Sequence, residues 1–220
     1  YYYQGTNFIA EVEAELKERM KEFLGCSEVE VRPISGQMAN TVVFSGLLDY
    51  FNQVDRRAEP KRLRSVMNHH IGRGGHLSAQ PMGALRDYIS IDPITERWAV
   101  VNFPVLLDNP YAIDIPKTAE LIEKHRPELI ILGKSMILHR EPVNQIAQII
   151  VGIKPKPIIM YDSAHVFGLI GPYFQEPLTE GADIITASTH KTFFGTQRGV
   201  IASNMSEESD YCELWERIER

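Results

Sequence analysis

Lys191 follows an apolar run, 182–187, at the position expected just beyond a buried strand. Burial there removes hydration from the ammonium group and lowers its pKa, because desolvation disfavours the charged form. The neutral amine is a nucleophile for an aldehyde. A lysine considered alone is more often a solvated surface residue. Because this one follows a buried strand, we predict that it holds pyridoxal phosphate as a Schiff base.

Asp162 directly follows a second apolar run, 158–161, and His165 lies three residues further on. A carboxylate in a partly desolvated crevice is stabilised by a cation, and a protonated pyridine nitrogen would serve. That pairing would keep the cofactor ring an effective electron sink. His165 could reach the same ring or its phenolic oxygen. The alternatives are that Asp162 caps the following turn and that His165 is a hydrogen-bonded core histidine.

Two further polar clusters follow apolar runs, Ser35-Gly36-Gln37 and Gly133-Lys134-Ser135. In an open α/β sheet, ligands collect beyond the carboxyl ends of the strands, so such residues are candidates for binding. Ser35-Gly36, at a strand-to-helix turn, offers backbone N–H groups, a hydroxyl and a helix N-terminus, which together suit a phosphate. A plain N-cap serine explains the same residues equally well.

Three histidines, His69, His70 and His76, lie in the glycine-rich run 68–76. Adjacent His69 and His70 point in opposite directions in an extended chain. No nearby carboxylate or cysteine completes a tetrahedral set, so a metal site is disfavoured. The functional interpretation is that the imidazole of His76 stacks on a flat ring, and the alternative is a polar loop.

The apolar pattern predicts alternating helices and strands that would position these clusters. An amphipathic helix is expected over 8–24, ended by Gly25, before a short strand at 29–31 and a second helix from about Met38 to Leu48. Later strands are predicted at 65–68, 98–101, 129–132, 158–161, 184–187 and 200–202, and helices at 116–125 and 142–151. Continuous β-branched runs of this kind indicate a three-layer α/β/α domain with a mostly parallel sheet.

The composition is that of a soluble globular protein, with 220 residues of which 44% are hydrophobic and 24% charged. A net charge of −6 provides no basic face for nucleic acid. Two cysteines, Cys26 and Cys212, are too few for a disulfide framework and fit a reducing cytoplasm. No apolar run reaches the roughly 20 residues that span a bilayer.

We expect one large domain over residues 1–220. The start at Tyr1, without a methionine or a charged leader, indicates a fragment. The charged segment 55–64 contains Pro60 and is expected to be a solvated loop to which we assign no function.

Five motifs occur in order along the chain: Tyr2-Tyr3-Gln4-Gly5, Ser35-Gly36-x-x-Ala39-Asn40, Gly74-Gly75-His76-Leu77, Asp162-x-Ala164-His165-Val166-x-Gly168-Leu169 and Thr189-His190-Lys191-Thr192. In this order they resemble the serine hydroxymethyltransferase family, over nearly the whole chain. The stretches 161–165 and 190–195 look closest to its archaeal, methanogen-type branch.

The resemblance implies pyridoxal phosphate (PLP) fold type I, the aspartate-aminotransferase type, with a seven-stranded, mostly parallel sheet and a homodimer that completes each site. It also implies a role for each cluster: Lys191 covalently bound to the cofactor, Asp162 on the pyridine nitrogen, His76 stacked on the ring, His165 near the phenolic oxygen, Ser35, Gly36 and Gln37 on the phosphate, Ser135 and Thr189 lining the cofactor, His190 supporting the site, and Tyr3 near the substrate.

The implied reaction interconverts serine and glycine and passes a one-carbon unit to a tetrahydropterin, either tetrahydrofolate or tetrahydromethanopterin. Gln37 and Met38 depart from the family's Ser-Gly-x-Gln-Ala-Asn order, and Arg198 stands where glycine is common. By resemblance, a catalytic glutamate would precede Tyr1 and a carboxylate-binding arginine would follow Arg220. The alternatives are another fold type I aldolase or transaldolase acting on β-hydroxy amino acids, and a PLP-binding fragment without catalytic activity.

Overall fold

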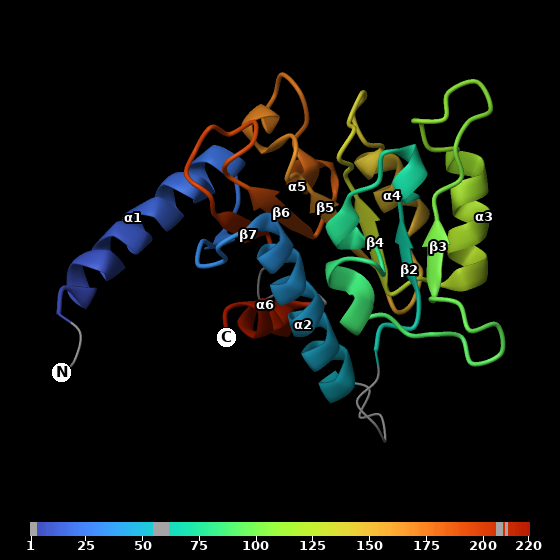
Figure 1. Cartoon of the computed structure of the whole chain (residues 1–220), viewed down its shortest axis with the longest axis horizontal. Coiled ribbons are helices and arrows are strands. Elements are labelled where there is room, and N and C mark those ends of the chain that lie inside the picture. The colour runs from blue at the N-terminus through green and yellow to red at the C-terminus, as the bar shows by residue number, and fades with distance from the viewer. Residues whose placement is uncertain (1–3, 55–61, 206–208, 210) are drawn as a thin grey trace.

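Seven strands form one sheet in the order β1-β7-β6-β5-β4-β2-β3 (Figure 1). The computed structural model describes residues 4–54, 62–205, 209 and 211–220. The strands are β1 (Glu28–Glu30), β2 (Val66–Asn68), β3 (Val100–Asn102), β4 (Leu129–Leu132), β5 (Ile158–Asp162), β6 (Ile184–Ser188) and β7 (Gly199–Ser203). The α-helices are α1 (Thr6–Leu24), α2 (Gly36–Val54), α3 (Ile115–His125), α4 (Val143–Ile149), α5 (Pro177–Glu180) and α6 (Cys212–Ile218).

The strand pairing confirms the predicted mostly parallel sheet and adds an antiparallel edge. From β3 through β2, β4 and β5 to β6, each neighbouring pair is parallel. By contrast, β7 is antiparallel to both β6 and β1. The apolar runs do not predict these directions, because buried strands carry similar residues whichever way they run. The carboxyl ends of β2, β4, β5 and β6 therefore meet at one edge of the sheet.

Helices cover both faces of the sheet, as expected for three layers. In β4, whose residues are all buried, Ile130 and Leu132 pack in the same hydrophobic cluster as the buried faces of α3 and α4. Leu129 and Ile131 pack in the cluster with α2 and α6 on the opposite face, as the alternation of a strand requires. Because burying one such side chain contributes about 1.5–3 kcal/mol, these two clusters hold the layers together.

Several elements differ in extent from the sequence prediction, and α2 and β3 are two examples. The helix expected from about Met38 begins at Gly36 and continues to Val54, and Tyr50 in its last part is buried in the core. The strand expected at 98–101 pairs only from Val100, because its partner β2 has three residues. Trp98 forms an isolated bridge with Ile91 instead.

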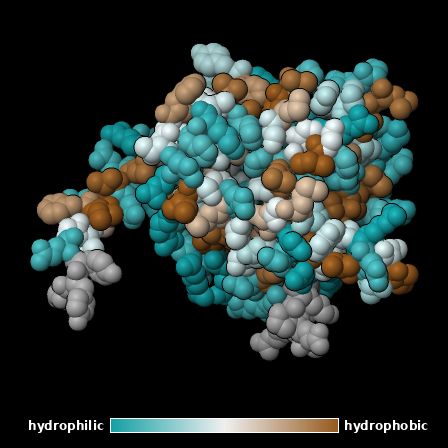
Figure 2. All heavy atoms as spheres, viewed as in Figure 1, coloured by the Kyte–Doolittle hydropathy of each residue, from teal (hydrophilic) through white to brown (hydrophobic). Residues whose placement is uncertain are grey.

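The N-terminal part of α1 projects from the body of the domain, whereas its C-terminal part packs against it (Figure 1). Met20, near its C-terminal end, is buried, whereas Phe8, Ile9 and Val12 are 72%, 59% and 66% exposed. Hydrophobic atoms are correspondingly visible along this helix in Figure 2. Within the part of the chain that the structure describes, no helix is both long and apolar enough to cross a membrane.

Candidate active site

The carboxyl ends of β5 and β6 bring Asp162 and Lys191 to the same edge of the sheet. Asp162 is the last residue of β5 and is in register with Thr186 of the parallel strand β6. Lys191 follows β6 in a turn, which a 2.7 Å hydrogen bond from the N–H of Gly195 to the carbonyl oxygen of Thr189 closes. The carboxylate of Asp162 and the amine of Lys191, which are far apart in the sequence, therefore lie at the same edge of the sheet.

Asp162 is 2% exposed and has several hydrogen-bond partners. Its Oδ2 lies 2.6 Å from Nδ1 of His76 and accepts a 2.8 Å hydrogen bond from Nδ2 of Asn40. Its Oδ1 accepts a 3.1 Å hydrogen bond from the N–H of Ala164, so Asp162 also caps the turn. Burial raises the pKa of Asp162, but the hydrogen bonds from His76 and Asn40 outweigh it and hold that pKa below its usual range. The site therefore contains a buried anion.

The amine of Lys191 lies next to His165. Its Nζ is 3.3 Å from Nε2 of His165, and the rings of His165 and His76 are 5.2 Å apart between centroids. Burial lowers the pKa of Lys191. Burial also lowers the pKa of His165 to about 4, with a further contribution from the charge of Lys191. The structure thus brings together Asp162, His76, His165 and Lys191, which we call the Asp162 cluster.

The turn before α2 was predicted to bind a phosphate. The hydroxyl of Ser35 accepts a 3.1 Å hydrogen bond from the N–H of Met38, so Ser35 acts as the N-cap. Gly36 packs against the end of β6, where a Cβ atom would lie only 2.2 Å from Oγ of Ser188. Gln37 is exposed. The first N–H groups of a helix have no acceptor within the helix, so an anion could bind there.

Ser135 and Thr189 make hydrogen bonds with residues outside the Asp162 cluster. The N–H of Ser135 donates to the carbonyl oxygen of Gly74 at 2.8 Å. The hydroxyl of Thr189 accepts a 2.9 Å hydrogen bond from the N–H of Arg198 and donates back to the carbonyl oxygen of that residue at 3.1 Å, which holds the following turn. His190 is exposed. Tyr3 lies outside the described residues, as does most of the segment 55–64.

Asn40 and Ser78 are functional candidates that the sequence did not assign. Nδ2 of Asn40 donates to both Oδ2 of Asp162 and Oγ of Ser78, and that hydroxyl lies 2.7 Å from Nδ1 of His76. Oδ1 of Asn40 is buried and has no partner among the described residues. The presence of Asn40 in one of the five motifs was the available signal, but only the folded chain shows which group it contacts.

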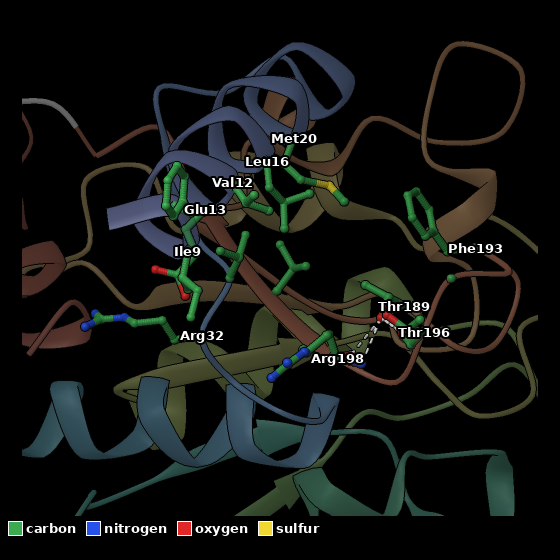
Figure 3. Close-up of a pocket in the computed structure, with 15 residues that line it drawn as sticks. Ile9, Val12, Glu13, Leu16, Met20, Arg32, Thr189, Phe193, Thr196 and Arg198 are labelled. Carbon is green, nitrogen blue, oxygen red and sulfur yellow. Dashed lines mark hydrogen bonds between the residues drawn. The ribbon is translucent and has the colours of Figure 1, made fainter. Parts of the chain in front are cut away.

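A cavity of about 530 Å³ lies between α1 and the turn that follows β6 (Figure 3). Val12 and Leu16 of α1 line one side, and Thr189, Phe193 and Arg198 line another. No member of the Asp162 cluster lines this cavity. It is therefore an apolar groove under α1, next to the turn that carries Lys191.

The two other histidines of the glycine-rich run have partners of their own. Nε2 of His69 lies 2.6 Å from Oε2 of Glu141, and Nδ1 of His70 accepts a 3.0 Å hydrogen bond from the N–H of Gly72. Across the described ranges, no group of three or more histidine, cysteine or acidic side chains could hold a metal ion.

The strand order, the two helical layers and the lysine and aspartate at one edge define a large domain of PLP fold type I. A solved structure of L-threonine transaldolase from Pseudomonas fluorescens, in its internal aldimine state, is similar with a TM-score of 0.75. The similarity covers 100% of this chain and 43% of that one at 21% identity, which shows a shared fold.

Sequence comparison identifies the family. The model of the serine hydroxymethyltransferase family matches residues 1–213. Serine hydroxymethyltransferase from Pyrobaculum calidifontis is 40% identical over 210 residues, which are 95% of this chain and 44% of the relative. The one from Archaeoglobus fulgidus is 34% identical over 222 residues, 100% of this chain and 43% of the relative. The chain belongs to the serine hydroxymethyltransferase family and spans less than half the length of these archaeal relatives.

Proposed function

We propose that this chain is the PLP-binding large domain of a serine hydroxymethyltransferase. The protein that contains it would interconvert serine and glycine and transfer a one-carbon unit to a tetrahydropterin. Family membership supports this class of transferase. The observation that carries the proposal is the buried, anionic Asp162 at the same sheet edge as Lys191, whose pKa burial lowers.

The donors and acceptors of the site fit pyridoxal phosphate. The anion of Asp162 suits a protonated pyridine nitrogen, and the amine of Lys191 suits an aldehyde. The first N–H groups of α2, at Gly36 and Gln37, suit a phosphate. The unpartnered Oδ1 of Asn40 could accept one more hydrogen bond. When bound, the cofactor supplies an electrophilic aldehyde and a ring that stabilises negative charge at Cα of the amino acid.

Each residue of the Asp162 cluster has a distinct task in this proposal. Asp162 would stabilise a proton at the pyridine nitrogen, and the hydrogen bonds from His76 and Asn40 keep its carboxylate charged. With its pKa lowered to about 4, His165 is neutral near pH 7 and can accept a hydrogen bond from Nζ of Lys191. Partial burial of Lys191 increases its neutral fraction, and only the neutral amine attacks an aldehyde.

The expectations that concern other molecules are part of the proposal. The amino acid substrates are serine and glycine, and the one-carbon acceptor is tetrahydrofolate or tetrahydromethanopterin. His76 would stack on the cofactor ring, and His165 would lie near its phenolic oxygen. Ser135 and Thr189 would line the cofactor, His190 would support the site, and Tyr3 would lie near the substrate. A homodimer would complete each site.

The test uses the full-length gene product. Serine cleavage is measured with tetrahydrofolate, with tetrahydromethanopterin and with neither. We expect one tetrahydropterin to accelerate cleavage strongly, because it captures the released one-carbon unit. Serine cleavage with the same rate under all three conditions would contradict the hydroxymethyltransferase assignment.

Two alternatives have separate signatures. The structural similarity to L-threonine transaldolase makes an aldol exchange on β-hydroxy amino acids the second candidate. It predicts exchange between an aldehyde and glycine without a tetrahydropterin. A domain that only binds the cofactor predicts a visible absorption band with added pyridoxal phosphate and no turnover of either kind.

A further inference from the structure

A second buried cluster of ionisable side chains lies near the loop that carries His76. It consists of Lys134, Glu141 and His69, which are 3%, 3% and 4% exposed. Oε1 of Glu141 lies 3.0 Å from Nζ of Lys134, and Oε2 lies 2.6 Å from Nε2 of His69. Nζ of Lys134 also donates a 2.7 Å hydrogen bond to the carbonyl oxygen of Tyr111. Burying such groups is costly even when they are paired, and none of them has a task in the reaction proposed above.

Both partners of Glu141 border the backbone that leads into His76. Lys134 pairs with Gly75 in an isolated antiparallel bridge. On the other side, the carbonyl oxygen of His69 is so close that a Cβ atom on Gly75 would lie 2.4 Å from it. Gly75 therefore passes between His69 and Lys134, whose side chains both end on the same carboxylate.

The backbone of Glu141 is connected to the strand that carries Asp162. Its N–H donates a 3.0 Å hydrogen bond to Oε1 of Gln175, and its carbonyl oxygen accepts a 2.6 Å hydrogen bond from Nε2 of that side chain. Oε1 of Gln175 also accepts a 3.0 Å hydrogen bond from the hydroxyl of Tyr161, the residue before Asp162 in β5. Glu141 is thus linked to both sides of the contact between His76 and Asp162.

We propose that Glu141 is a positioning residue of the site, which acts through His69 and Lys134 to hold the segment 74–76 so that Nδ1 of His76 stays against Oδ2 of Asp162. The contact itself is 2.6 Å long, and side chains at a binding site keep such geometry only when the groups around them hold them in place. The consequence for catalysis rests on the proposed function, whereas the positioning is a property of the chain without any ligand.

The test compares two pair variants of the 220-residue chain. The first, Lys134→Met with Glu141→Met, removes both charges together, so that neither charge is left buried without its partner. The control, Lys156→Met with Asp183→Asn, removes a less buried ion pair, whose atoms are 2.7 Å apart and which lies just before β6, at the opposite end of that strand from Lys191. Folding of each variant is checked by denaturant unfolding. Glu141→Gln serves as the conservative variant, because an amide can still bridge Lys134 and His69.

The first readout is the imidazole ¹⁵N resonances of His76 in the ligand-free chain, assigned by their loss in His76→Asn. We expect the Nδ1 resonance to move toward that of an unbonded imidazole in the Met pair variant, to stay close to the wild-type value in Glu141→Gln, and to be unchanged in the control. An unchanged resonance in the folded Met pair variant would overturn the proposal. So would an equal change in the control.

The second readout is the dissociation constant for pyridoxal phosphate. We expect the Met pair variant to bind about tenfold more weakly, by analogy with the partners that support metal ligands, whose loss costs about 10- to 100-fold in affinity. The control should stay within roughly twofold of the wild type. If the His76 resonance moves as expected but even the wild-type chain fails to bind pyridoxal phosphate, the proposed function fails and the positioning role of Glu141 is supported.

Discussion

At the residue scale, the two oxygens of the Asp162 carboxylate have different partners. The sequence left open whether Asp162 caps a turn or pairs with a cation in a ligand. In the structure, Oδ1 accepts the hydrogen bond from the N–H of Ala164, while Oδ2 faces His76 and Asn40. The turn fixes the orientation of the carboxylate, and its second oxygen lies on the side of the histidine. The capping role therefore supports the proposed binding role.

Lys191 is the residue whose replacement tests cofactor capture most directly. We expect Lys191→Ala to abolish the visible absorption band that pyridoxal phosphate acquires on binding a lysine amine, because no other amine lies in the Asp162 cluster. Lys117→Ala is the control, since Lys117 is exposed and paired with Asp114 on α3. The absorption spectrum of each chain with added cofactor is the measurement. A band of wild-type intensity in Lys191→Ala would place the covalent site elsewhere.

His165 makes folding depend on pH. The pKa of His165 lies at about 4 in the folded chain and near 6.5 in the unfolded chain. As the pH falls, the imidazole is therefore protonated in the unfolded chain before it is protonated in the folded one. Stability is therefore lost as the pH falls from about 6.5 toward about 4. Allowing for partial exposure, we expect the wild type to lose about 1 kcal/mol more than His165→Gln between pH 7 and pH 5. Urea unfolding at both pH values measures this, and equal losses would contradict the shift.

At the scale of elements, the loop after β4 depends on a glycine that approaches the neighbouring strand closely. Gly133 has a φ of +95°, and a Cβ atom there would lie 2.1 Å from the carbonyl oxygen of Asp162. This contact sets the distance between the ends of β4 and β5. A side chain at residue 133 would clash with the carbonyl oxygen of Asp162. Both residues lie at the ends of buried strands, so relieving the clash would disturb the packing of the sheet.

Gly133→Ala tests that contact. We expect it to lower the free energy of unfolding by roughly 3 kcal/mol, which combines left-handed strain with overpacking. Gly152→Ala is a matched control, because Gly152 has a φ of +82° but open space around the position of a Cβ atom. Strain alone should cost the control about 1 kcal/mol. Equal losses, measured by denaturant unfolding, would show that the close approach to Asp162 does not matter.

At the scale of the whole molecule, α1 leaves apolar side chains in solvent. Phe8 and Val12 are 72% and 66% exposed. Apolar side chains gathered on one exposed helix favour association. We expect the chain to self-associate and the double variant Phe8→Glu, Val12→Lys to do so less.

Light scattering at increasing protein concentration measures that association. The free energy of unfolding of the monomer should stay within about 0.5 kcal/mol, because exposed side chains contribute little to it. Val151→Lys is the control, since Val151 is 80% exposed at the end of α4, away from α1. Association that persists unchanged in the α1 variant would show that another surface is responsible.

Much of the architecture could be predicted because its determinants are local. Apolar runs indicated the central strands β4, β5 and β6, and helical spacing with Gly25 indicated α1. The antiparallel edge of β1 and β7 could not be predicted, because the direction of a buried strand leaves no mark on its composition. The short extent of β3 also depends on its partner, which no local pattern reveals.

The sequence by itself determined which residues follow the central strands, and so that Asp162, His165 and Lys191 would meet at one sheet edge. It also determined the family, through motifs that are contiguous in the chain. Only the tertiary structure decided that Asn40 and Ser78 complete the hydrogen bonds around Asp162. It also decided that Glu141 pairs with His69 and Lys134, next to the loop that carries His76. Those contacts join residues from separate elements, and their geometry depends on strand order, register and loop packing together.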